Sequence, residues 1–494
     1  MRISSVLVAL LLAFPLFGQE KASLTYQVEA SALAGGGDFA PLWFTSNRYG
    51  KVGVSNKQAS LRTGMFYQQA LKHHWTIEAG LDLVGGANLT SNFWIHQAYA
   101  DFSWKQLSLS VGSKERSGFP LTKNEALTSG WLIEGPNTRP IPQIRAEIKD
   151  YLAIPGTRKW FSFKGHLAYG WFTDGRWQQD FAQANKNYMQ HVLYHSKSLM
   201  LRIGNKDKFP LDFEFGILMT TQFGGKQYLK LADGSSQLKI SMPQNLKAYW
   251  KAFLPQEGGS DTPAGEQVNT EGNVMGSWNF ALNWYPGDWK IKTYLEHLFD
   301  DHSQMFWEYG RWKDGLIGFE ITPPANKWIS SVVWEGMNTK DQTKSILYDG
   351  FWGSFPDVQM SGNDDYYNQY LYGAWQHHGL GLGNPLLPGP AYNADGSIRF
   401  ISNRVRSNHV GVSGCPTNEW SWRILASFAR HWGTYTEPLD KQRKRFSGLM
   451  EVTYKPEILK GWSASVAVGF DKGNYLDNTV GGMLTIRKIG GFNL

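Results

Sequence analysis

The chain has 494 residues, of which 18% are charged and 15% aromatic, and its formal net charge is +7. Soluble domains average ~25% charged residues, so this composition departs from that of an ordinary globular protein. The aromatic content excludes an intrinsically disordered chain, which lacks the apolar surface needed to fold. Beyond the N-terminal segment, no run of ~20 apolar residues predicts a membrane-spanning helix. With its 53 glycines, the profile is typical of an outer-membrane β-barrel.

The N-terminal segment predicts export. Arg2 gives it a positive start, and an apolar run follows at Val6–Phe17. A stretch this short is typical of a cleaved secretory signal. We therefore expect a signal peptide over 1–19 and one barrel domain over 20–494, in the outer membrane of a Gram-negative bacterium.

The mature chain keeps an excess of basic over acidic residues. Removing residues 1–19 takes away Arg2 and no acid, which leaves 48 basic and 42 acidic residues, a charge of +6. This balance suits an acidic partner, such as an anionic polysaccharide or lipid phosphate, or it only keeps the surface solvated. The sole cysteine, Cys415, excludes an intramolecular disulfide.

Apolar and polar residues alternate in segments of roughly ten residues, which is the pattern of barrel strands. The segment His74–Val84 is an example, because Leu81 lies on its apolar face and Asp82 on its polar face. We expect the apolar face to meet lipid and the polar face to meet a wet lumen. Leu81→Arg should then impair assembly, and Asp82→Asn should be mild. A soluble sandwich remains the alternative for any single strand.

Candidate strands recur along the whole chain and predict an all-β, transmembrane antiparallel barrel of ~16–18 strands. A barrel of this size has a lumen too wide for side chains alone to fill. The last strand should pair with the first, because that removes both sheet edges. The expected strands lie near 23–33, 58–71, 74–85, 93–104, 106–113, 160–173, 197–205, 211–223, 273–285, 289–300, 315–322, 328–336, 397–404, 405–413, 420–432, 445–455, 461–471 and 478–488.

Three long insertions interrupt the strands, at 114–158, 224–270 and 340–395. Loops above ~15 residues are usually functional or disordered. In a wide barrel they can fold inward, so we expect these loops and some short helices to occlude the lumen. Helices are expected at Pro243–Leu254 and around Asp180–His195.

Two motifs are candidate luminal or anion contacts. In Glu134–Ile148, prolines stiffen a segment that presents Arg139, Gln143 and Arg145, and guanidinium groups suit carboxylates and phosphates. Alternatively, these arginines pair with acids of the barrel wall. The segment Tyr294–Phe306 gathers several titratable side chains, which suit a hydrogen-bonded turn better than a metal site. They are Glu296, His297, Asp300, Asp301 and His302.

The segment Gly362–Gly379 is the candidate glycan-binding site. Its aromatic rings offer flat faces on which sugars can stack, and its polar side chains can bond sugar hydroxyls. The alternative is that this loop packs into the barrel mouth. The candidate residues are Asp364, Asp365, Tyr366, Tyr367, Asn368, Tyr370, Tyr372 and Trp375.

Catalytic patterns are weak. Asp301, His302 and Ser303 have the residue types of a hydrolytic triad, but adjacent residues do not generally converge on one nucleophile. His191 and His195 lack the glutamate of a zinc protease motif. We therefore expect no enzyme activity, no cofactor, no metal and no nucleic-acid partner.

Four motifs together carry a family resemblance: Ala32–Gly50, Asn137–Arg145, Glu296–Phe306, and GNDDYYNQ with GNPLL (Gly362–Gln369 and Gly383–Leu387). In this order they resemble the capsule-assembly Wzi-like family, particularly its Bacteroidetes-type branch. The resemblance covers roughly residues 22–494. It implies a barrel of about eighteen strands with a non-catalytic, lectin-like role in attaching capsular or other surface polysaccharide. It carries over no individual site residue.

Two functions follow as hypotheses. The first is an occluded, monomeric barrel in outer-membrane lipid that binds surface or capsular polysaccharide. The second is a porin or sugar-selective channel. The long insertions favour occlusion, and a hydrolase or acyltransferase is a distant third.

Overall fold

The computed structural model describes residues 22–494 except 264–265, 267–269, 301–304, 306–312, 343–345, 348–359 and 362–363. The expected signal peptide lies outside the described residues. Within the described ranges, no helix has the length and apolar character needed to cross a membrane.

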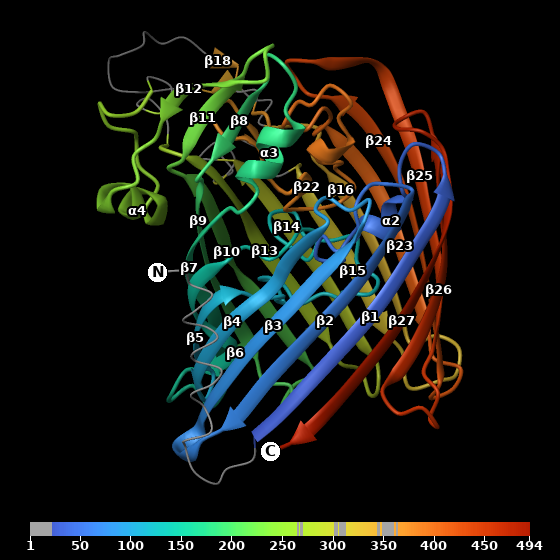
Figure 1. Ribbon diagram of the computed structural model, residues 1–494. Helices are drawn as coiled ribbons and strands as arrows, with labels where there is room; N and C mark the ends of the chain where they lie inside the picture. Colours follow the sequence, from blue (N-terminus) through green and yellow to red (C-terminus); the bar gives the residue numbers. More distant parts are fainter. Residues whose placement is uncertain are drawn as a thin grey trace.

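Eighteen strands form one closed antiparallel barrel (Figure 1). Neighbours in sequence pair with each other, and β1 pairs with β27 from Ser23↔Asn493 to Gly36↔Val480. This confirms the expected closure of the first strand on the last. In order around the barrel the strands are β1 (Ala22–Gly36), β2 (Lys57–Ala70), β3 (Trp75–Ala87), β4 (Phe93–Trp104), β5 (Leu107–Ser113), β6 (Gln143–Ala153), β7 (Phe161–Trp171), β9 (Leu193–Gly204), β10 (Leu211–Phe223), β13 (Asn273–Trp284), β14 (Lys290–Asp300), β15 (Gly315–Thr322), β16 (Ser331–Asn338), β23 (Val405–Gly414), β24 (Trp420–Gly433), β25 (Pro438–Tyr454), β26 (Trp462–Gly473) and β27 (Thr479–Asn493).

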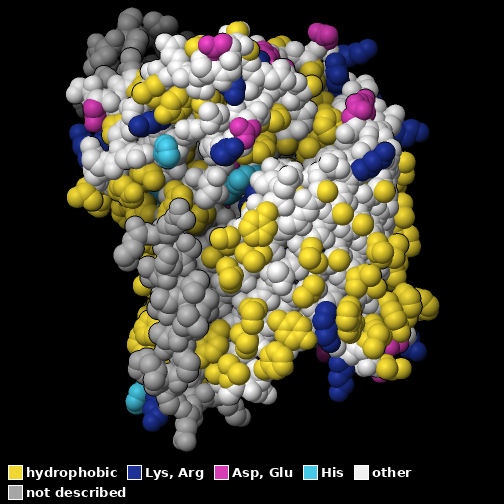
Figure 2. Space-filling model, viewed as in Figure 1, with side chains coloured by type: hydrophobic (Ala, Val, Ile, Leu, Met, Phe, Trp, Pro, Cys, Tyr) yellow, Lys and Arg dark blue, Asp and Glu magenta, His cyan; other side chains and the backbone are white. Residues whose placement is uncertain are grey.

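The burial of the strands is the reverse of a soluble sandwich. Outward-facing Leu61 and Met65 on β2 are more than half exposed, whereas Arg62 between them is 6% exposed. Hydrophobic side chains cover the outer wall in Figure 2, and charged ones gather at its two ends. This arrangement suits a lipid environment. At the end where β1 begins and β27 ends, exposed tryptophans form an interfacial belt: Trp104, Trp284, Trp289, Trp328, Trp420 and Trp462.

The two ends of the barrel differ in their connections. At the end where β1 begins and β27 ends, strands are joined by short turns such as 71–74, which contains the 3-10 helix η2 (Lys72–His74). At the other end the connections are long. Short periplasmic turns and long extracellular loops are the rule for such barrels, so we call these the inner and the outer end.

The outer end carries most of the small elements (Figure 1). A three-stranded sheet of β12, β11 and β8 stands above the wall. The helices are α2 (Leu42–Thr45), α3 (Gly175–Phe181), α4 (Leu246–Phe253) and η3 (Pro390–Tyr392). The additional strands are β8 (Asn187–Gln190), β11 (Lys226–Lys230), β12 (Ser236–Ser241), β17 (Ile346–Leu347), β18 (Met360–Ser361), β19 (Asn368–Gln369), β20 (Gly373–Ala374), β21 (Gln376–His377) and β22 (Leu380–Gly381).

Several expected boundaries were wrong. The insertion expected at 114–158 ends at residue 142, because β6 is a wall strand paired with β5 and β7. Residues 397–404 are not a strand but belong to the segment before β23. The region Asp180–His195 contains only the end of α3, followed by β8 and the start of β9. Helix α4 starts three residues after Pro243, capped by the Asn245 side chain.

Two chain segments fill the lumen. The plug segment, residues 114–142, bonds His96 of β4 through Glu115 (2.8 Å) and Glu335 of β16 through the Ser129 amide (2.5 Å). Strands β4 and β16 are nine positions apart in a ring of eighteen, so this segment spans the diameter. The second luminal segment, residues 364–404, packs on it. There the Trp375 indole donates to the Ile133 carbonyl at 2.8 Å.

Candidate functional site

Four of the expected sugar-stacking rings are buried. Tyr366, Tyr367, Tyr372 and Trp375 are each no more than 2% exposed, and they form the core between the two luminal segments. The Tyr367 ring lies 5.5 Å from that of Phe400. These rings are packed in a core, as the packing alternative expects, and Tyr372 also lines the cleft described next. A plug that crosses a wide lumen needs an apolar core of its own. The aromatic rings of the second luminal segment contribute to that core.

The remaining candidates gather at a cleft on the outer end, with a volume of about 520 Å³. Tyr370 is 58% exposed there. Asp365 and Asn368 also line this outer cleft, whereas Asp364 is half-buried outside it. The full lining is Gln178, Asn185, Lys186, Asn187, Tyr188, Met189, Gln227, Asp365, Asn368, Gln369, Tyr370, Leu371, Tyr372, Gly373, Ser397, Ile398 and Arg399.

The hairpin β19–β20 positions Tyr370. Gln369 Oε1 accepts hydrogen bonds from the amides of Leu371 (2.6 Å) and Tyr372 (3.0 Å), which fixes the turn. The turn ends at Gly373, whose φ is +71° and where a Cβ would lie 2.6 Å from the Ile398 carbonyl oxygen. Only glycine fits this position without strain. The Tyr370 ring is thereby held at the rim of the cleft by a rigid tip.

Polar groups surround the ring. Asp365 Oδ1 accepts from Asn368 Nδ2 (3.2 Å) and Asn403 Nδ2 (2.5 Å), and its other oxygen has no described hydrogen-bond partner. Burial raises the pKa of the Asp365 carboxyl. Lys186 and Arg399 also line the cleft, where they pair with Asp395 and Glu437 at 2.7 Å each. An exposed ring beside donors and acceptors can bury the apolar side of a sugar and bond its hydroxyls.

The two arginines expected to contact an anion, Arg139 and Arg145, do not act together as one guanidinium site. Arg139 lies on the plug segment with its guanidinium 3.8 Å from the Trp94 ring, and it donates to the Ser91 hydroxyl at 3.1 Å. Arg145 lies on β6 and pairs with the wall acid Glu147 at 2.6 Å. Pairing with wall acids is therefore correct for Arg145, whereas none of the described acids pairs with Arg139. Both arginines and Gln143 line a cavity of about 50 Å³ between their elements.

The residues expected near the end of β14 are structural. Glu296 accepts from the Leu132 amide at 2.9 Å and pairs with Lys123 of the plug segment. A His297 ring nitrogen bonds the Asp314 carbonyl at 2.8 Å. Their contacts fit the hydrogen-bond alternative. Asp301 and His302 lie outside the described residues.

Sequence reasoning missed the cluster that fixes the start of the plug segment. Ligand atoms of Asp82, His96 and Glu115 lie within 4.8 Å of one another, which is close enough for a metal ion. However, Arg62 pairs with Asp82 at 2.5 Å and with Glu115 at 3.2 Å. Lys51 pairs with Glu115 as well, at 3.0 Å. These cations occupy the position of a metal, and no spacing in the sequence indicates the cluster.

Comparisons with known proteins bear on the fold. No protein-family model and no curated protein sequence matches the chain. Among solved structures, Escherichia coli Wzi is similar with 13% identity and a TM-score of 0.56, over 99% of this chain and 88% of that one. It is described as an outer-membrane protein of group 1 capsule assembly and a carbohydrate-binding β-barrel.

Two further structures are less similar. OccAB4 of Acinetobacter baumannii has 9% identity and a TM-score of 0.47, over 96% of this chain and 99% of that one. OccK1 of Pseudomonas aeruginosa has 8% identity and a TM-score of 0.46, over 95% and 99%. The fold defines the class of this protein, which is an outer-membrane β-barrel of eighteen strands.

Proposed function

We propose that this protein is a non-catalytic outer-membrane barrel that binds surface or capsular polysaccharide at its outer end. The outer cleft carries the proposal, because it combines the exposed Tyr370 ring with the Asp365 carboxylate, one oxygen of which has no described hydrogen-bond partner. The fold similarity to Wzi, which is described as carbohydrate-binding, supports it. So does the resemblance of the sequence motifs to the Wzi-like family.

We expect the protein to retain polysaccharide at the cell surface through many weak contacts, without tight binding of any single sugar unit. A ring face and a few hydrogen bonds give a weak site for one sugar unit. A long polysaccharide can engage many barrels on one cell, and this avidity multiplies the retention. The net positive charge of the mature chain would strengthen the binding of an acidic polymer, and added salt would weaken that part.

The channel alternative is less favoured. The plug segment bonds opposite sides of the wall, and the second luminal segment packs on it. Two packed segments across the lumen leave little room for a general diffusion pore.

The test is Tyr370→Ala. Aromatic contacts of this kind contribute ~0.5–1.5 kcal/mol, so we expect purified protein to bind polysaccharide extracted from its own strain about three- to tenfold more weakly. Cells with this variant should release polysaccharide into the medium. Trp250→Ala is the matched control, since this ring is 54% exposed on α4 and does not line the cleft. A correctly assembled Tyr370→Ala variant with wild-type retention would refute the proposal.

A further inference from the structure

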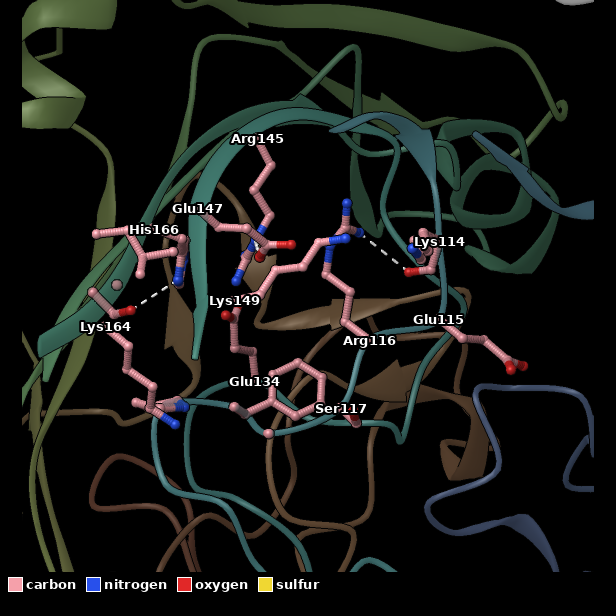
Figure 3. Close-up of a pocket in the computed structure, with 16 residues that line it drawn as sticks. Lys114, Glu115, Arg116, Ser117, Glu134, Arg145, Glu147, Lys149, Lys164 and His166 are labelled. Atoms are coloured by element: carbon pink, nitrogen blue, oxygen red, sulfur yellow. Dashed lines mark hydrogen bonds and ion pairs between the residues drawn. The ribbon is translucent and has the colours of Figure 1, made fainter. Parts of the chain in front are cut away.

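A second cavity lies inside the barrel, below the plug segment. This inner pocket, with a volume of about 270 Å³, is enclosed by the first residues of the plug segment and by β6, β7 and β9 (Figure 3). Its lower part reaches the inner end. Lys149, which lines it, donates its amide to Gln106 O in the short turn between β4 and β5. The pocket therefore faces away from the outer cleft and shares no residue with it.

Cationic side chains outnumber carboxylates in the lining of this inner pocket. Lys114 pairs with Glu78 and Asp101 just outside the lining, and Lys149 also pairs with Glu78. Five cationic side chains line the pocket, against three carboxylates, and the carboxylates are already engaged. Glu147 pairs with Arg145 at 2.6 Å, and Glu115 pairs with Lys51 at 3.0 Å. Glu134 accepts from the hydroxyls of Tyr194 and Ser196. The cations are Lys114, Arg116, Arg145, Lys149 and Lys164.

Two of the cations lack a carboxylate partner. Arg116 donates only to the Lys114 carbonyl (3.2 Å) and the Ser110 hydroxyl (3.0 Å), and none of the described acids forms an ion pair with it. Its Nε is buried without a hydrogen-bond partner among the described groups. Among the described residues, Lys164 has one long hydrogen bond, 3.4 Å to the Thr122 hydroxyl, and its ammonium lies 5.0 Å from the Tyr151 ring centroid. Unpaired charge below the surface is unfavourable unless an opposite charge joins it.

Arg116 stays charged at neutral pH. Burial, together with the nearby Arg145, lowers its pKa to about 10, which is still far above 7. His166 lies on β7, paired with Glu147 of β6, and is held by Ser196 (2.7 Å) and Ser198 (2.8 Å). Figure 3 shows Arg116, Arg145 and Lys149 converging from the plug segment and from β6.

We propose that the inner pocket binds an oxyanion, a carboxylate or a phosphate, carried on a group no larger than about one sugar unit. A guanidinium fork beside ammonium groups is the donor set that such anions require. The volume of about 270 Å³ lies just below the ~300 Å³ at which the usual range for ligand pockets begins, so the ligand must be small. The ligand would enter from the inner end, so this site is separate from the proposed polysaccharide-binding cleft.

The experiment titrates purified protein in detergent micelles at low ionic strength with inorganic phosphate and with glucuronate, using calorimetry. Glucose serves as the neutral probe. We expect saturable binding of at least one of the two anions and no binding of glucose. The anion that binds more tightly shows whether the natural ligand carries a phosphate or a carboxylate. Arg116→Gln combined with Lys164→Gln should weaken binding at least tenfold. The double variant Lys159→Gln with Lys206→Gln is the control, since both lysines are exposed in turns at the inner end.

Arg116→Lys tests the fork without removing the charge, and it should lose part of the affinity while assembling normally. Failure of wild-type protein to bind either anion at millimolar concentration would overturn the proposal. Unchanged binding in the Arg116 and Lys164 double variant would do the same. Tyr370→Ala should leave anion binding intact. The proposal for the outer cleft and the proposal for the inner pocket can therefore be refuted separately.

Discussion

At the scale of single residues, the inward-facing polar side chains are anchors rather than a wet lining. Asp82 is fully buried, and its carboxylate accepts from Arg62 (2.8 Å to Nε) and Gln97 (3.0 Å). The alternation of β3 correctly predicts that Asp82 faces inward. It does not predict the partners, because these come from the neighbouring strands β2 and β4.

Asp82→Asn should therefore be costly, contrary to the mild effect expected from the sequence. Removing one partner of a buried ion pair lowers the free energy of unfolding by ~3–5 kcal/mol. In the Asp82→Asn protein, Arg62 still has Glu115 as an ion-pair partner, so we expect a loss at the lower end of this range, ~3 kcal/mol. The measurement is urea unfolding in detergent. Outward-facing Leu81→Arg is the companion variant, with an expected cost of ~2–4 kcal/mol in lipid. An Asp82→Asn protein as stable as wild type would show that the luminal ion pair contributes little.

At the scale of elements, alternation predicted most wall strands because lipid and lumen impose opposite demands on neighbouring residues. It missed β6, although Ile144 and Arg145 alternate there, because the prolines before this strand suggested a continuous loop. It also suggested a strand over 397–404, in a segment that lies within the lumen instead. Alternation of apolar and polar residues identifies a strand that has lipid on one face and the lumen on the other. The luminal segments lie inside the barrel and do not meet lipid, so alternation does not locate them.

The aromatic site shows a similar limit. The described part of the segment Gly362–Gly379, residues 364–379, lies within the barrel, but composition does not distinguish a ring that stacks on sugar from a ring that packs in a core. Tyr366 and Tyr370 are four residues apart, one buried and the other exposed. The difference depends on the plug segment, which reaches this place from a distant part of the chain.

The docking of the second luminal segment should depend on pH through Asp314, in the connection before β15. This carboxylate accepts from Tyr366 Oη (3.2 Å) and the Asp341 amide (3.0 Å). Burial raises its pKa to about 6, from a usual value of 3.8. The folded state thus holds the proton more tightly than the unfolded state. Stability should fall as pH rises from about 4 to about 6, and then stay level.

The check compares wild type with Asp314→Asn by urea unfolding in detergent between pH 4 and pH 7. A shift of about two pKa units corresponds to ~3 kcal/mol at most. The difference in free energy of unfolding between the two proteins should change over this window, while hydrogen exchange of residues 364–404 should rise only in wild type. Parallel pH curves for the two proteins would contradict the assignment.

At the scale of the whole molecule, the barrel and its contents are separable parts. Replacing residues 120–134 by a Gly-Ser linker removes most contacts of the plug segment with β14, β15, β16 and β23 but leaves the wall strands intact. We expect low single-channel conductance for wild type in planar bilayers and a several-fold higher conductance for this variant. The linker should leave Gln143–Arg145 in place, because these residues belong to β6. High conductance in wild type would favour the channel function.

The pairing of β1 with β27 has a further consequence for how the molecule forms. The ion pair between Glu29 and Arg487 joins residues 458 positions apart in the chain. Contacts of such long range are entropically expensive to form and slow folding. Until they form, both terminal strands present open edges that can pair with other chains. The closing seam is therefore the last part of the wall to be completed, and a newly made chain must be protected from aggregation until its final strand arrives.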